Sequence, residues 1–244
     1  VILFEYCKKK KLKFVSSVFG YKSFNLYNNF KTDFVKIPSG EINNISFLKY
    51  LDGFNKNIIL STGMANKKEI DNAVKNLRKT KNKQKLSLMH CVSSYPAKFD
   101  EMNLNSIKYL KKKYKLKVGL SDHTNSTVIP LMANAIGADY IEKHFTLDKS
   151  LIGPDHKASI DEAQLKEIVY SIKNQKKIYG RTGKFVSKSE EINKSVVRKS
   201  IHASKKISKD EKFSLSNICL KRPGNGISAD KYLNIIGTKA KKKL

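Results

Sequence analysis

Short apolar runs that end in polar residues recur six times along the first 146 residues, with amphipathic stretches of helical period between them. The runs are 12–17, 33–41, 57–63, 86–95, 116–124 and 138–146. Apolar strands that alternate with helices indicate a parallel sheet with both faces covered. In a βα barrel, the carboxyl ends of the strands form the edge that carries the active site. Because the polar residues collect at those ends, the pattern predicts an enzyme.

Three of the stretches between the runs carry an apolar stripe at helical spacing. They are 67–80, 103–114 and 161–179. Asp161 is a suitable N-cap for the last of them, and Gly180 a suitable end. The three helices fit the βα units of a compact α/β fold.

Six such units do not close an eight-stranded barrel. The chain has no initiating methionine and opens in a helical stretch. We therefore expect an α/β fold of the (β/α)8 TIM-barrel type that lacks its first two βα units. An open, doubly wound sheet is the alternative. Against it, no glycine-rich nucleotide-binding turn follows any of the runs.

The character of the sequence changes after Gly180. Residues 181–195 are polar and charged, which is typical of a linker. Residues 196–244 hold short β-like runs separated by turn-rich pieces such as RPGNG at 222–226. We expect a partial barrel domain at 1–180, a linker at 181–195 and a small second domain at 196–244 that is incomplete at its C-terminus.

The formal net charge of +28 raises the possibility of a nucleic-acid partner. Lysine supplies most of the positive charge and spreads along the predicted helices, whereas base and phosphate recognition favours arginine. The arginines are Arg78, Arg181, Arg198 and Arg222. We therefore expect attraction of small anionic substrates rather than nucleic-acid binding.

The cysteines and the apolar runs bear on the compartment. Cys7, Cys91 and Cys219 are odd in number and lack CxxC spacing, which argues against a disulfide scaffold or a zinc knuckle. No apolar run reaches the length of a membrane span. A reducing, cytoplasmic setting without membrane attachment is the expectation.

His123 and His144 form the sharpest pair of candidate functional residues. Each follows an apolar run, and the two runs are adjacent predicted strands, so both imidazoles can point into the same rim. Two imidazoles with open positions suit a divalent transition metal that also holds a substrate oxygen. From spacing alone, a hydrogen-bonding role for one of them is an equal alternative. His90 lies inside an apolar run and is interpreted as a core histidine.

Lys36 stands inside a predicted strand, where an unpaired charge is costly. It should therefore face an anion or carboxylate at the rim, or an ion pair inside the barrel. Glu41 follows on a loop, where a solvated acid is the simpler interpretation. Asp122 could orient His123, although a helix cap is the better explanation. Serines recur at the strand ends and together suit a phosphate: Ser17, Ser39, Ser61, Ser93 and Ser121.

Seven motifs follow one another along nearly the whole chain: KIPSGEI (36–42), ILSTGMA (59–65), HCVSSYPA (90–97), VGLSDHT (118–124), IEKHFTLDK (141–149), GPDHKAS (153–159) and KRPGNGIS (221–228). In order and spacing they resemble the sialic acid synthase family. The resemblance implies a βα barrel followed by a small antifreeze-like (SAF) domain. It implies condensation of phosphoenolpyruvate with an N-acetylmannosamine-type sugar to a nine-carbon 2-keto acid, with release of phosphate. The alternative is a catalytically incomplete fragment that binds only sugar or a partner.

The resemblance also implies roles by position. His123 and His144 resemble the two protein ligands of a divalent metal, usually Mn2+, with Mg2+ or Co2+ also possible. Glu41 and Asp155 resemble catalytic-proton or sugar-site residues. Arg222 resembles a residue that reaches from one chain of a domain-swapped homodimer into the barrel of the other to hold the acetamido group. Positions that resemble substrate contacts are Ser17, Lys36, Ser39, Ser61, Ser93, Tyr95 and Ser121.

Overall fold

The computed structural model describes residues 1–51, 56–78 and 86–244, which divide into two compact units, Val1–Gly180 and Arg181–Leu244. In the first unit the helices are α1 (Ile2–Lys9), α2 (Gly20–Asn28), α3 (Ile45–Tyr50), α4 (Lys67–Arg78), α5 (Asn105–Tyr114), α6 (Val128–Ala135) and α7 (Glu162–Tyr179). Among the described residues, none of the helices has the length and apolarity needed to span a bilayer.

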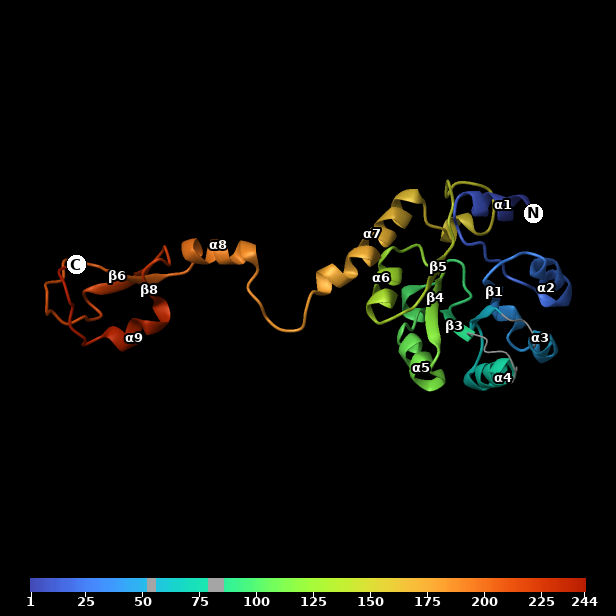
Figure 1. The fold of residues 1–244 in the computed structure, drawn as a ribbon, viewed down its shortest axis with the longest axis horizontal. Helices are drawn as coiled ribbons and strands as arrows, with labels where there is room; N and C mark the ends of the chain where they lie inside the picture. The colour runs from blue at the N-terminus through green and yellow to red at the C-terminus, as the bar shows by residue number, and fades with distance from the viewer. Residues whose placement is uncertain (52–55, 79–85) are drawn as a thin grey trace. The chain divides into compact units, whose positions relative to one another are not determined.

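The first unit contains a five-stranded parallel sheet, drawn in Figure 1 with helices along its outer side. Its strands are β1 (Phe34–Ile37), β2 (Asn57–Ser61), β3 (Leu86–Cys91), β4 (Lys117–Asp122) and β5 (Ile141–Lys143). They pair in sequence order, β1-β2-β3-β4-β5, without the reversal of order that defines a doubly wound sheet. The α/β class with a parallel sheet is confirmed, and the sheet curls as a half-barrel does.

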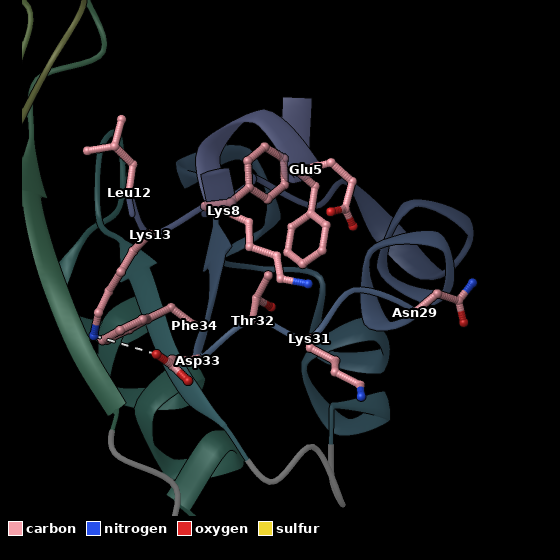
Figure 2. A pocket seen from close by; sticks show the side chains of 11 residues that line it. Glu5, Lys8, Leu12, Lys13, Asn29, Lys31, Thr32, Asp33 and Phe34 are labelled. Carbon is pink, nitrogen blue, oxygen red and sulfur yellow. Dashed lines mark ion pairs between the residues drawn. The ribbon is translucent and has the colours of Figure 1, made fainter. Parts of the chain in front are cut away.

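The first of the six apolar runs, 12–17, is not a strand, so the prediction of a strand there is wrong. Its backbone meets β1 at one parallel bridge, between Ser17 and Lys36. The Lys13 ammonium also lies 5.5 Å from the ring centroid of Phe34 (Figure 2). Leu12 is 63% exposed and Val15 is 40% exposed. A strand of a parallel sheet is buried on both faces, and this run lacks that burial.

The three helices predicted from apolar stripes are present as α4, α5 and α7. Asp161 caps α7 through a capping box with Gln164, and Gly180 ends the helix with a positive φ of 60°. Residues 79 and 80 of the first predicted helix lie outside the described residues. The stripes of α4 and α5 pack in the same core as the sheet, where alternate strand residues such as Ile37, Leu60 and Leu88 are fully buried. In α7 only Ile168 is buried.

The second unit is small and mostly antiparallel. It contains α8 (Lys188–Val197), β6 (Ser200–Ala203), β7 (Ile218–Lys221), β8 (Ile227–Ser228) and α9 (Tyr232–Ile235). The sheet order is β7-β6-β8, and its core centres on Ile207, Ile218 and Ala240. Helix α8 covers all of 188–195, the second half of the stretch predicted to be a linker. A capping box between Ser187 and Glu190 starts that helix.

Candidate active site

Polar side chains gather at the C-terminal ends of the parallel strands, on the face that turns away from the helices. Lys36 lies on β1, Ser61 ends β2, Cys91 ends β3, and Ser121 lies opposite Glu142 in the register of β4 and β5. Because strand residues alternate between faces, these positions share the inner face of the curled sheet. The inner rim, defined by these five residues and the two histidines that follow β4 and β5, is the candidate site.

The structure brings the imidazole rings of His123 and His144 together. His123 directly follows β4's last residue and His144 directly follows β5. Their ring centroids lie 5.2 Å apart, and the Tyr95 ring lies 4.2 Å from His123 and 5.7 Å from His144. Three side chains that the sequence analysis singles out thus share one corner of the rim.

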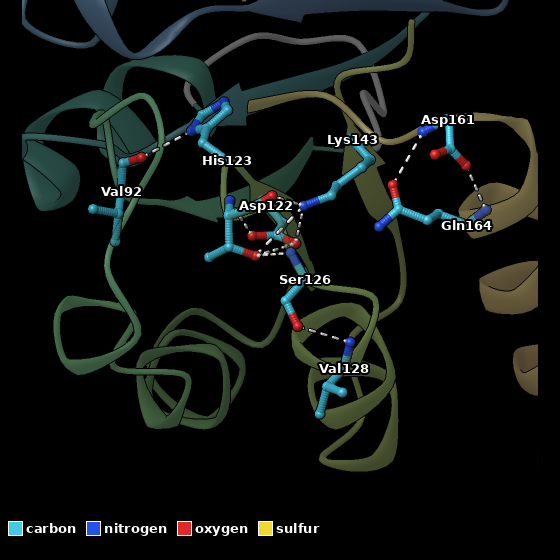
Figure 3. A network of polar contacts seen from close by, with 9 residues as sticks. Val92, Asp122, His123, Ser126, Val128, Lys143, Asp161 and Gln164 are labelled. Atoms are coloured by element: carbon cyan, nitrogen blue, oxygen red, sulfur yellow. Dashed lines mark hydrogen bonds and ion pairs between the residues drawn. The ribbon is translucent and has the colours of Figure 1, made fainter. Parts of the chain in front are cut away.

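Each imidazole has a defined environment. The Nδ1 atom of His123 lies 2.8 Å from the carbonyl oxygen of Val92 (Figure 3). A carbonyl oxygen only accepts, so Nδ1 is the donor and Nε2 is the nitrogen left to face a ligand. Burial lowers the pKa of His144, and His123 lowers it further, while Asp155 acts in the opposite sense. Nδ1 of His144 lies 3.8 Å from Oδ2 of Asp155. Neutral imidazoles are the form that binds metals.

The two rings fit a shared divalent cation. A metal–nitrogen bond of about 2.1 Å places a ring centroid roughly 3 Å from the ion, so two rings on one ion lie up to about 6 Å apart. The observed 5.2 Å falls within that limit. In the described parts of the chain, no three His, Cys, Asp or Glu side chains are grouped to hold a metal. A shared ion would therefore have two protein ligands and open positions for water or substrate.

Lys36 pairs with a carboxylate, which is one of the arrangements that the sequence analysis left open. Its Nζ donates to both oxygens of Glu142, at 2.7 and 2.6 Å, and the Ser121 hydroxyl donates to Oε1 at 2.6 Å. Burial alone would raise the pKa of Glu142, but the charge and hydrogen bonds of Lys36 and the Ser121 hydroxyl lower it overall. The Ser121 proton is committed to Glu142, whereas the ammonium keeps a third proton for a ligand.

Gly63 marks a second polar corner of the rim. Its backbone N–H donates to the Ser39 hydroxyl at 3.0 Å. A Cβ at this position would clash with the hydroxyls of Ser39 and Ser93 and lie 3.2 Å from the Cys91 sulfur. The Ser61 hydroxyl is buried and has no hydrogen-bond partner among the described residues. These hydroxyl groups form a polar corner of the kind that suits an oxyanion.

The remaining predicted site residues are less closely grouped. Ser17 is exposed and joins β1 only by its backbone bridge. Glu41 lies in a 3-10 turn (Ser39–Glu41), where its carboxylate accepts a hydrogen bond from Asn44 at 2.8 Å. Asp155 is exposed beside His144. Arg222 is exposed in the second unit, at the end of β7.

Sequence reasoning missed two features of the site. It did not single out Glu142, although an acid two residues before a strand-end histidine lies on the same strand face as that histidine. It also favoured a helix cap for Asp122, and that prediction is wrong, because α6 has no side-chain cap. Asp122 forms an ion pair with Lys143 at 2.7 Å, which the sequence analysis did not predict. His90 is partly buried, and its Nε2 lies 2.7 Å from the Met102 carbonyl oxygen, so this histidine has a hydrogen-bond partner away from the rim.

A model of the NeuB family matches residues 1–184, which include every residue of the inner rim. The chain belongs to the NeuB family. It is 48% identical over 238 residues to N,N'-diacetyllegionaminic acid synthase of Campylobacter jejuni, covering 97% of this chain and 71% of that protein. Identity to the protein of the same name from Legionella pneumophila is 35% over 241 residues, covering 98% and 68%.

The structural comparison agrees with this family membership. The crystal structure of N-acetylneuraminic acid synthetase from Leptospira borgpetersenii matches with a TM-score of 0.70 at 35% identity. The match covers 79% of this chain and 67% of that one. The resemblance to sialic acid synthases that the seven motifs carry is therefore confirmed for the NeuB-family chain.

Proposed function

We propose that this NeuB-family chain condenses phosphoenolpyruvate with an acylated amino sugar to a nine-carbon 2-keto acid and releases phosphate. The observation that carries the proposal is the inner rim, where two imidazoles with ring centroids 5.2 Å apart lie beside a Lys36–Glu142 pair at the strand ends. The similarity to legionaminic and sialic acid synthases supports it.

The chemistry needs an anion site and charge stabilisation. The methylene carbon of phosphoenolpyruvate bonds to the aldehyde carbon of the open-chain sugar. Water then adds to the neighbouring carbon, and the C–O bond to phosphate breaks. Lys36 and the Ser39, Ser61 and Ser93 hydroxyls supply positive charge and donors for the phosphate and carboxylate. Preorganised donors of this kind stabilise developing charge without reorganisation.

The other corner of the rim would handle the aldehyde. His123 and His144 would hold a divalent cation, Mn2+ or alternatively Mg2+ or Co2+, which would supply Lewis-acid polarisation of the aldehyde oxygen. Glu41 and Asp155 are the proposed proton carriers. The Tyr95 ring is proposed to bind the sugar, because it covers the two imidazoles and is half exposed.

The sugar is proposed to be of the legionaminic or neuraminic type rather than the pseudaminic type. The motifs KIPSGEI and GPDHKAS favour this choice, and so does the 48% identity to a diacetyllegionaminic acid synthase. That relative's name implies a six-carbon sugar with two acetamido groups. We propose that this diacetamido sugar is preferred over N-acetylmannosamine.

The second unit is proposed to act as the SAF domain of a homodimer. In that arrangement, Arg222 of one chain holds the acetamido group of sugar bound to the barrel of the other. Its guanidinium suits an amide oxygen because it presents several fixed donors.

Ser17 is proposed as a further substrate contact next to Lys36.

Phosphate release from phosphoenolpyruvate tests the reaction. The full chain is assayed with Mn2+ and either the diacetamido sugar or N-acetylmannosamine, and with His144→Ala as the control. Release that needs both sugar and metal, and is lost in the control, supports the synthase. Binding of sugar without any release would instead support a chain that binds but does not turn over.

A further inference from the structure

A buried ion pair between Asp122 and Lys143 lies behind the two histidines. The Asp122 side chain is 0% exposed and that of Lys143 is 6% exposed, and their charged atoms are 2.7 Å apart. The Lys143 ammonium also donates to the backbone carbonyl of Thr124. Thr124 in turn donates to Asp122 from its backbone, at 2.9 Å, and from its hydroxyl, at 3.2 Å. Figure 3 shows the Asp122 and Lys143 side chains pointing toward each other in this network.

The pair lies on the face of the sheet opposite to the inner rim. Asp122 and Lys143 are register partners in β4 and β5, one step beyond the Ser121–Glu142 pair. Successive strand residues point to opposite faces, so this charged pair shares its face with Leu120, which packs in the core. No step of the proposed reaction uses either side chain.

Stability alone does not account for such a pair. Desolvating two charges is costly, and replacing a buried pair by apolar residues is often neutral or stabilising. What a buried pair supplies is geometric: it has one satisfied arrangement and penalises a shift in register. The β4–β5 ladder holds only three residue pairs, so its alignment has few other determinants.

The network holds the chain on both sides of His123. Lys143 immediately precedes His144. Its ammonium donates to the carboxylate of Asp122, the residue before His123, and to the carbonyl oxygen of Thr124, the residue after it. Asp122↔Lys143 is also the last register pair before the two imidazoles. Movement of β5 along β4 would therefore break these contacts as it displaced His144 relative to His123.

We propose that the Asp122–Lys143 pair is a positioning device that holds the imidazoles of His123 and His144 at the spacing suited to one divalent cation. The metal part rests on the proposed function. The positioning part rests on the contacts alone, so the two are tested by separate measurements.

The test variant is Asp122→Asn/Lys143→Met, which removes both charges together and leaves neither one buried without its partner. Mn2+ affinity is measured by electron paramagnetic resonance of the free ion. Ring-to-ring cross-relaxation between the two histidines is measured by NMR in metal-free protein. Asp71→Asn is the matched control, because it breaks an ion pair with Lys113 on helices that carry neither histidine.

We expect Mn2+ binding about ten- to a hundred-fold weaker in the double variant, as for other groups that orient metal ligands. We also expect weaker ring-to-ring cross-relaxation, whereas Asp71→Asn changes neither. A folded double variant with wild-type affinity and wild-type cross-relaxation would overturn the proposal. If it does not fold, Lys143→Arg replaces it, because the larger guanidinium cannot keep the same contacts; unchanged affinity and cross-relaxation there would have the same meaning.

The two proposals fail differently. Suppose that the wild-type protein does not bind Mn2+, but cross-relaxation between the rings is weaker in the variants of the pair than in the wild type. That result would contradict the metal site and support the positioning role. If the wild-type protein binds Mn2+ and the variants of the pair show the same affinity and cross-relaxation, the metal site is supported and the positioning role is contradicted.

Discussion

Lys36 and Glu142 are 106 residues apart in the chain, and the ammonium of one donates to both carboxylate oxygens of the other. They lie on β1 and β5, the two edges of the five-stranded sheet. A flat sheet would hold its edge strands about 19 Å apart, given about 4.8 Å between neighbours. The ion pair therefore requires the sheet to curl, and it places a positive and a negative group in the concave face.

Removing the two partners of this pair should have unequal effects on stability. Glu142→Gln leaves the ammonium of Lys36, whose side chain is only 10% exposed, without a carboxylate. Lys36→Met leaves a carboxylate that is 44% exposed and can reach water. We expect Glu142→Gln to reduce the free energy of unfolding by about 1–3 kcal/mol, and Lys36→Met by less. Urea unfolding measures both, and the reverse order would contradict this account.

Replacing either rim histidine should abolish metal-dependent turnover. His144 is partly exposed, and His123→Ala removes one hydrogen bond to a backbone carbonyl, so neither change should unfold the chain. Phosphate release with Mn2+ and sugar is the measurement, with circular dichroism as the check on folding. Full activity in either folded variant would remove the assignment of that residue as a metal ligand.

Adding one methyl group at Gly63 should weaken phosphoenolpyruvate binding. The new Cβ of Gly63→Ala would displace the Ser39 and Ser93 hydroxyls, and these are proposed donors to the ligand. Gly40→Ala is the matched control, because a Cβ at Gly40 meets nothing within 4 Å. We expect KM for phosphoenolpyruvate to rise about tenfold or more for the first variant only, which corresponds to about 1.4 kcal/mol of binding. Equal KM values in the two variants would argue against this corner as the anion site.

The Asp71–Lys113 pair should make stability depend on pH in the acid range. Hydrogen bonds from Lys113 and then Tyr114 lower the pKa of Asp71 below its usual 3.8. A lowered folded-state pKa gives stability that is complete above the unfolded value and is lost as the pH falls through the folded value. The difference in unfolding free energy between wild type and Asp71→Asn should therefore be constant near neutrality and shrink below about pH 4. Urea unfolding between pH 7 and pH 3 measures it. A difference that grows with acidity would reverse the sign of the argument.

Arg222→Ala should weaken binding of the sugar but not of phosphoenolpyruvate. Loss of a hydrogen bond from a charged donor reduces the binding free energy by roughly 1.5–3 kcal/mol. We therefore expect KM for the sugar to rise about tenfold or more, and KM for phosphoenolpyruvate to stay within about twofold. Steady-state kinetics separates the two constants. Mixing Arg222→Ala with His144→Ala tests exchange between chains, because one intact site can form in a mixed dimer. Absence of any rescue would argue against an arginine supplied by the partner chain.

The local pattern of the sequence predicted much of the first unit. The apolar stripes gave α4, α5 and α7 within a few residues, and the Asp161 cap and the Gly180 end are present. The ends of the apolar runs placed His123 and His144 at the same rim. This prediction was possible because the alternation of side chains along a strand is a local property of the sequence. The run at 12–17 has the same apolar pattern but lacks the burial that would make it a strand, and burial depends on neighbours that are distant in sequence.

What the sequence alone determined is the α/β class, the position of the polar residues at strand ends and, through its motifs, the family. Only the tertiary structure decided which charges meet: Lys36 with Glu142 on the inner face, and Asp122 with Lys143 on the outer face. The physical reason is that pairing of side chains follows strand register and sheet curvature. Both arise from contacts between segments that are far apart in the chain.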